Sequence, residues 1–95
     1  MYTTLAEVTH SDLATFLSVF ATRGAALRKR HGSTGAEVLV GAEDPGRCVL
    51  IIDWESRARF EAFLVDPEVP ATMRSGGITA PPKFTPLARV ASLPA

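Results

Sequence analysis

The chain is short, electrically balanced and apolar for its size. It has 95 residues, with ten basic and ten acidic side chains and a formal net charge of zero, so no basic field is available to attract nucleic acid or an anionic membrane. Hydrophobic residues make up 46% of the sequence, yet a chain of this length buries only about 60–65% of its unfolded surface. We therefore expect one domain, residues 1–95, with an apolar surface left for a partner.

The cysteine content and the apolar runs bear on location. The single cysteine, Cys48, excludes an intrachain disulfide and fits a reducing compartment. Because it lies in an apolar run with no basic neighbour to activate it, a buried small hydrophobe is favoured over a nucleophile. The first residues lack the features of a signal peptide, and the longest apolar run, residues 48–52, is far too short to cross a bilayer. We expect a soluble, cytoplasmic protein.

The first third of the chain predicts a strand and a helix. Residues 3–8 are rich in β-branched side chains and predict the strand. Thr9 then predicts a helix cap, with Asp12 in the capping-box position three residues on. The pattern predicts one helix that continues through Gly24 and stops at Gly32. Its apolar stripe recurs at helical spacing: Leu13, Phe16, Leu17, Phe20, Ala21 and Leu27.

The middle of the chain predicts a hairpin with an unusual second strand. Residues 37–41 and 47–54 are expected to pair across a turn at residues 43–46. A half-exposed strand would alternate apolar and polar residues, but here both faces require burial. Helices cover only one face, so the simplest cover for the other is a second copy of the sheet in a homodimer; the alternative is a monomer whose loops cover it. The two apolar sets are Cys48, Leu50, Ile52 and Trp54 on one face, and Val49 and Ile51 on the other.

The last third predicts two short helices and a strand. Ser56 caps a helix that carries Phe60, Phe63 and Leu64 on one face. A third helix begins with Asp66 as cap and Pro67 in its first position, and the glycine pair at 76–77 ends it. Residues 87–91 predict the last strand. Because the preceding proline cannot donate to a ladder, this strand should lie at a sheet edge or start after the proline. The order βαββαβ predicts an α+β, ferredoxin-like subunit, which together with sheet-to-sheet pairing gives a dimeric α+β barrel.

Motifs for metals and nucleotides are missing from the sequence. His10 and His31 lie at opposite ends of the predicted first helix, about 30 Å apart at about 1.5 Å rise per residue, so they do not share an ion within one subunit. The sequence has no HxxxH, no CxxC and no glycine-rich phosphate loop. We therefore expect no metal and no cofactor.

The remaining candidate for a site is an aromatic, apolar cleft between helices and sheet. Its expected wall would suit a flat apolar ligand, although the same residues could simply form core. His10 is the best candidate proton carrier because histidine titrates near neutral pH, and Arg59 is a polar group that could reach the mouth. The expected substrate-binding residues are Phe16, Phe20, Phe60, Phe63, Met73 and Arg59, and the expected catalytic residues are Trp54 and His10.

Three short motifs in the second half resemble a known family. Trp54-Glu55-Ser56, Asp66-Pro67 and Pro81-Pro82-Lys83 resemble antibiotic biosynthesis monooxygenases of the dimeric α+β barrel superfamily. The resemblance implies a homodimer that oxidises anthrone-type phenols of polyketide pathways to quinones with oxygen and without metal or flavin. The first half of the chain agrees with the family in element order.

At most of the positions that correspond to the family's site residues, this chain has a different type of residue. Trp54 matches, whereas the family's tyrosine and arginine fall on Phe60 and Met73, and its asparagine falls near Leu50. This loss of polar groups raises a second hypothesis, a non-catalytic small-molecule-binding or accessory protein. A third is a polyketide cyclase or isomerase that uses His10. The haem-degrading branch is disfavoured because its tryptophan and histidine positions fall on Phe63 and Met73.

Overall fold

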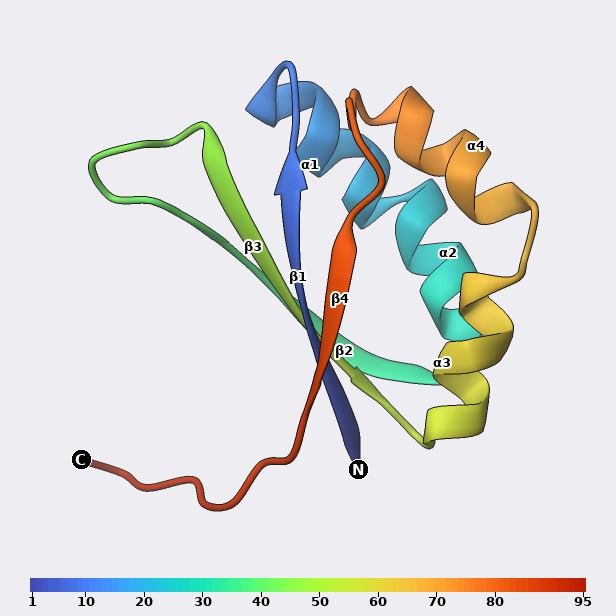
Figure 1. The fold of residues 1–95 in the computed structure, drawn as a ribbon, viewed down its shortest axis with the longest axis vertical. Coiled ribbons are helices and arrows are strands. Elements are labelled where there is room, and N and C mark those ends of the chain that lie inside the picture. Colours follow the sequence, from blue (N-terminus) through green and yellow to red (C-terminus); the bar gives the residue numbers. More distant parts are fainter.

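A computed structural model describes residues 1–95, in which one antiparallel sheet carries all the helices on one face (Figure 1). The sheet order is β2-β3-β1-β4, with antiparallel pairing throughout. This confirms the predicted α+β, ferredoxin-like subunit. No helix has both the length and the apolar character needed to cross a membrane. The elements are β1 Tyr2–Thr9, α1 Leu13–Ala21, α2 Arg23–Arg30, β2 Ser33–Val40, β3 Arg47–Trp54, α3 Arg57–Leu64, α4 Glu68–Ser75 and β4 Lys83–Leu87.

The predicted single first helix was wrong, because the helix breaks at Thr22. This residue has φ −114° and ψ −89°, and its hydroxyl donates to the Ser18 carbonyl oxygen at 2.7 Å. Such back-bonding competes with the helical ladder and bends helices. The cap was also misplaced: Thr9 belongs to β1, and Asp12 is the N-cap, accepting from the Thr15 backbone N–H at 2.9 Å. Hydrogen bonds from Thr15 lower the pKa of the Asp12 carboxyl.

Several predicted boundaries shift. β2 begins at Ser33 rather than residue 37, across an irregularity between Ser33 and Gly35 that apolar alternation does not reveal. β4 ends where the last strand was expected to begin, so the prediction of residues 87–91 was wrong. Of the two placements expected for this strand, the edge position is the one found, with Pro86 inside β4. α4 starts at Glu68, one residue later than predicted, although the Asp66 carboxylate accepts from the Glu68 backbone N–H at 2.9 Å.

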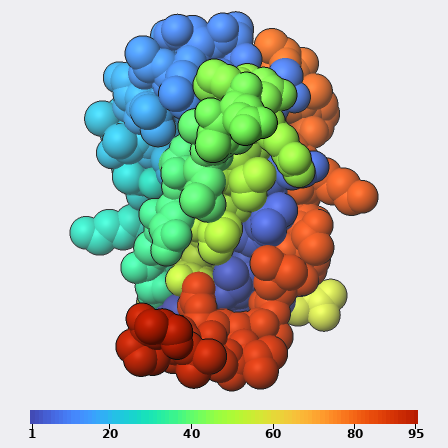
Figure 2. Space-filling view, turned by 90° about the vertical axis from the view of Figure 1, so that its left-hand side faces the viewer, coloured from blue at the N-terminus to red at the C-terminus, as the bar shows by residue number.

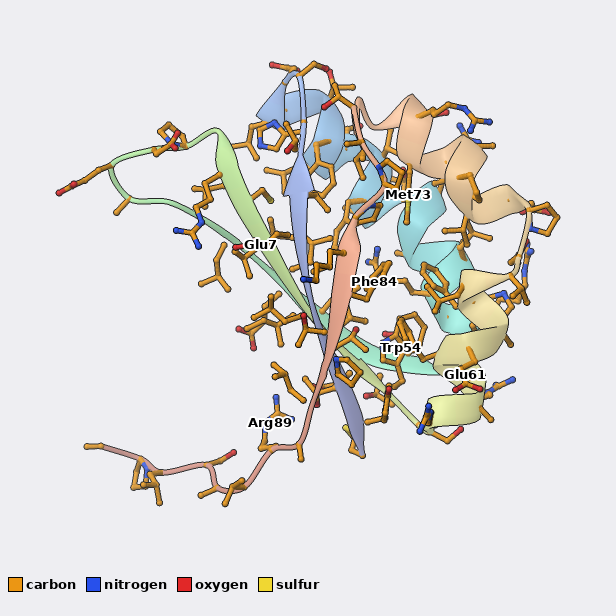
Figure 3. All side chains as sticks on the ribbon, viewed as in Figure 1. Glu7, Trp54, Glu61, Met73, Phe84 and Arg89 are labelled. Carbon is orange, nitrogen blue, oxygen red and sulfur yellow. The ribbon has the colours of Figure 1, made fainter.

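The two faces of the sheet differ as predicted for β3. Cys48, Leu50, Ile52 and Trp54 are buried beneath the helices, whereas the alternate residues Val49 and Ile51 are only half-buried. Figure 2 shows this second face, where residues 88–95 lie across one end of the open sheet. Figure 3 shows Trp54, Met73 and Phe84 between the helices and the sheet, with Glu7 and Arg89 on the open side.

Candidate active site

A cavity of about 60 Å³ lies between the sheet and helices α1, α2 and α4. Twelve of its 17 lining residues are hydrophobic. At about 10–15 Å³ per water, this volume holds about four water molecules. Val8, Leu50 and Ile52 form the wall on the sheet side, and Phe84 closes it from β4.

Four of the six predicted substrate-binding residues line this cavity. Phe16 and Phe20 come from successive turns of α1, and their stacked rings lie with centroids 5.4 Å apart. Phe63 reaches the cavity from α3 and Met73 from α4. Phe16 and Phe63 are buried, whereas Phe20 and Met73 are half-buried. The helical spacing in the sequence therefore located four of the ten residues that the helices contribute to the wall.

Phe60 and Trp54 are outside the lining and belong to a packed aromatic cluster. Trp54 is 0% exposed, and its ring centroid is 5.3 Å from that of Phe60 and 4.8 Å from that of Phe63. Its indole N–H donates to the Thr4 hydroxyl at 3.0 Å. Trp54 is therefore outside the cavity wall and packs against one of its residues, Phe63.

His10 lies next to the cavity, behind its wall. The residue follows β1 and forms an isolated bridge with Ile78, while its ring stacks on Phe16 at 5.7 Å. Both Phe16 and Ile78 line the cavity. The two ring nitrogens of His10 are buried and have no hydrogen-bond partner in the protein. A buried polar atom without a partner costs about 1–3 kcal/mol, which marks His10 as a group retained despite its cost.

Arg59 does not approach the cavity. Its side chain is exposed and forms an ion pair with Glu55 at 3.7 Å. The neighbouring arginine on α3, Arg57, pairs with Glu61 on the surface at 2.8 Å. Neither arginine therefore acts at the mouth.

Arg28 is the residue that sequence reasoning missed. It lies in the last turn of α2, where a cation suits the helix dipole, but its side chain lines the cavity. Its guanidinium carbon lies 3.7 Å from the centroid of the Phe20 ring, and Nη1 donates to the Phe20 carbonyl oxygen at 3.0 Å. Burial lowers the pKa of Arg28 to about 10, so the side chain is still charged at neutral pH. Gly24, four residues earlier on the same helical face, is the sequence feature that could have indicated space for the Arg28 side chain against the helix.

Other reactive side chains lie elsewhere. Burial raises the pKa of the Cys48 thiol, as expected for a buried small side chain under the helices. His31 lies at the end of α2, with Nε2 at 2.7 Å from the Asp66 carboxylate. No group of three or more His, Cys, Asp or Glu side chains is arranged to hold a metal ion.

Comparison with known proteins identifies the family. Residues 2–75 match the family model for antibiotic biosynthesis monooxygenase. The chain belongs to this family. The match includes the first half of the chain, where we saw agreement only in element order, and it ends before the Pro81-Pro82-Lys83 motif.

Solved structures share the whole fold at low sequence identity. SnoaB of Streptomyces nogalater, a cofactor-independent oxygenase, has a TM-score of 0.78 at 23% identity, covering 99% of this chain and 97% of its own. A Bordetella bronchiseptica protein carrying the same family name has a TM-score of 0.78 at 18% identity, covering 95% and 97%. Rv0793 of Mycobacterium tuberculosis has a TM-score of 0.68 at 17% identity, covering 96% of each chain. A search of curated proteins found no match.

Proposed function

We propose that the protein is a cofactor-independent monooxygenase that oxidises a small aromatic or polyketide-type molecule in the cavity beneath α1, α2 and α4. The observation that carries the proposal is an apolar cavity at the helix–sheet interface of a chain from the antibiotic biosynthesis monooxygenase family. SnoaB, which has the same fold, is described as a cofactor-independent oxygenase.

The reaction needs no external reductant. A ring methylene flanked by a phenolic system becomes a carbonyl, losing two hydrogens and four electrons. Dioxygen accepts those four electrons: one oxygen atom enters the carbonyl and the other leaves as water with the two hydrogens. The deprotonated substrate supplies every electron, so the protein contributes a dry, shaped cavity and a proton acceptor.

Each role falls on a particular residue. Phe16, Phe20 and Phe63 would contact the flat faces of the substrate, and Met73 would adapt to its edge because methionine is flexible. His10, whose ring nitrogens have no partner in the protein, lies behind Phe16, so it would accept the substrate proton once the Phe16 ring moves aside. Trp54 would support Phe63 instead of touching substrate.

The volume requires the wall to move when substrate binds. A cavity of about 150 Å³ is known to hold benzene, whereas this one measures about 60 Å³. Half-buried Phe20, Arg28 and Met73 line the cavity where it approaches solvent. Arg28 and Phe20 hold each other in place, so the flexible Met73 side chain is the one that would shift outward and admit a ring.

Oxygen uptake with hydroxylated anthrones tests the function. We expect uptake above the uncatalysed rate, with label from isotopic dioxygen appearing in the quinone carbonyl. Met73→Trp should fill the cavity and abolish the uptake. Leu64→Trp, on the exposed surface of α3, is the matched control and should leave it intact. Equal uptake by both variants would place the chemistry elsewhere, and no uptake with any anthrone would refute the proposal.

A second candidate function, a non-catalytic small-molecule-binding protein, rests on the apolar character of the cavity. Leu50 and Met73, which stand at polar positions of the family, both line it. Saturable binding of aromatic ligands, recovered chemically unchanged after prolonged incubation in oxygen, would favour this function over the first.

The open face of the sheet supports pairing with a second copy. Leu39 is 47% exposed and Leu87 is 42% exposed, and Val49 and Ile51 are half-buried between them. Covering these side chains with the same face of another subunit would bury them all, in a two-fold arrangement. Light scattering during gel filtration should give twice the monomer mass. Ile51→Glu should reduce the measured mass to that of a monomer. Val65→Glu, at an exposed position on the helix side, should leave the mass unchanged.

A further inference from the structure

We propose that Arg28 makes the cavity selective for aromatic ligands in their anionic form, with a negatively charged oxygen on the ring held against the guanidinium. The inference rests on the proposed function in one respect, that the cavity is the substrate site. It adds the residue that stabilises the substrate anion within the cavity.

Arg28 is the single charged side chain among the 17 residues that line the cavity. The rest of the wall consists of apolar side chains, glycines, a proline and the hydroxyl of Thr72. An apolar wall by itself favours neutral ligands, because desolvating a charge is costly. One cation in such a wall reverses that preference for a ligand of opposite charge, since electrostatic attraction is strong where water is excluded.

The Arg28 guanidinium has hydrogen-bond donors that are not used in an ion pair. Arg30, Arg47, Arg57, Arg59 and Arg89 all form ion pairs with carboxylates, whereas Arg28 forms none. Its hydrogen bond goes to a neutral carbonyl, that of Phe20, through Nη1. Arginine carries five N–H donors, so the Nε and Nη2 sides remain available to an oxygen anion.

The surrounding backbone holds the side chain in this position. Phe20 lies in the last turn of α1, where carbonyl groups have no partner farther along the helix, and its carbonyl accepts from Arg28 instead. Gly24 provides space for the Arg28 side chain, because a Cβ at position 24 would lie 3.1 Å from Arg28 Nη1. The Phe20 ring covers the other side through the cation–π contact. The break at Thr22 thus creates the acceptor that anchors the cation.

The ligand class follows from these two features together. Phe16 and Phe20 offer ring faces, and Arg28 lies over the Phe20 ring at 3.7 Å. A flat ring in contact with these side chains would bring an oxygen at its edge toward the guanidinium. A phenolate or an aromatic enolate has this shape and charge, and it is also the form that donates electrons to oxygen.

The test uses 4-nitrophenol, whose neutral and anionic forms absorb at different wavelengths and interconvert near neutral pH. Titrating it with and without saturating protein gives the probe's own pKa when bound. We expect bound probe to show a pKa lowered by about one unit, which corresponds to about tenfold tighter binding of the anion. The shift should vanish in Arg28→Met, which keeps an apolar stem, and persist in Arg28→Lys.

Arg74→Met is the matched control, because Arg74 lies on the exposed side of α4 beside Met73 and outside the lining. It should leave the shift unchanged. Equal affinity for both charge states, no binding of the probe, or the same loss in both methionine variants would overturn the inference. If the pKa of bound probe shifts as expected but the protein consumes no oxygen with any anthrone, the proposed oxygenase activity is refuted and the selectivity for anions is supported.

Discussion

The helix–sheet interface has two halves that use aromatic residues in opposite ways. Beneath α3, rings fill the space: the centroid of Phe60 lies 5.3 Å from those of both Trp54 and Phe84. Beneath α1, α2 and α4 the rings surround a cavity of about 60 Å³ instead. Phe63 belongs to both halves. The spacing of aromatic residues along a helix therefore does not by itself distinguish core residues from cavity-lining ones. That depends on whether the helix lies close enough to the sheet for the side chains to interlock.

The largest effect is expected in the packed half, for Trp54→Ala. Removing a buried tryptophan costs about 3–5 kcal/mol of unfolding free energy, and Thr4 would lose its hydrogen-bond donor. Urea unfolding measures this loss. Leu64→Ala, a truncation at an exposed position of α3, is the control and should change stability little. A stable but inactive Trp54→Ala protein would assign the indole to the site.

The next effect is expected at the wall of the cavity, for His10→Phe. Loss of a proton acceptor should lower the rate of oxygen consumption by about 10²- to 10⁴-fold. The unfolding free energy should not fall, because the phenyl ring keeps the stacking on Phe16 and removes two unpartnered nitrogens. A fall in stability with the rate unchanged would reverse the assignment and make His10 a structural residue.

A smaller effect is expected for Met73→Ala, which enlarges the cavity beneath α1, α2 and α4. Because Met73 is half-buried, we expect a loss of about 1–2 kcal/mol, below the range for fully buried methionine. The enlarged cavity should bind bulkier aromatic ligands more tightly, as calorimetry with a series of increasing ring size would show. Unchanged affinities across that series would mean that Met73 does not limit access.

The smallest effect concerns the contact between His31, at the end of α2, and Asp66, in the segment between α3 and α4. The hydrogen bond from His31 lowers the pKa of the Asp66 carboxyl below its ordinary value of 3.8. The contribution to stability is therefore present above that value and is lost as the pH falls through the lower, folded-state pKa. Urea midpoints across the acid range should drop less steeply in Asp66→Asn than in the parent. Parallel curves would show that the contact contributes nothing.

The features predicted well are those that a local pattern specifies. Ser56 caps α3 as expected, accepting from the Arg59 backbone N–H at 3.3 Å, because a cap depends on residues three apart. β3 runs over the predicted residues 47–54, because its side chains are apolar on both faces. Features that depend on competing local interactions were predicted less well, such as the break at Thr22 and the bulge in β2.

The order of strands and helical segments and the buried face of β3 could be predicted from the sequence alone, as could the side of the sheet on which the aromatic residues lie. Each of these follows from spacing along the chain, since alternation and helical periodicity decide which side chains share a face. Only the tertiary structure decided that Trp54 is core, that His10 lies behind Phe16, and that Arg28 faces the cavity. The physical reason is that these positions depend on distances between segments remote in sequence, which are set when the helices pack onto the sheet.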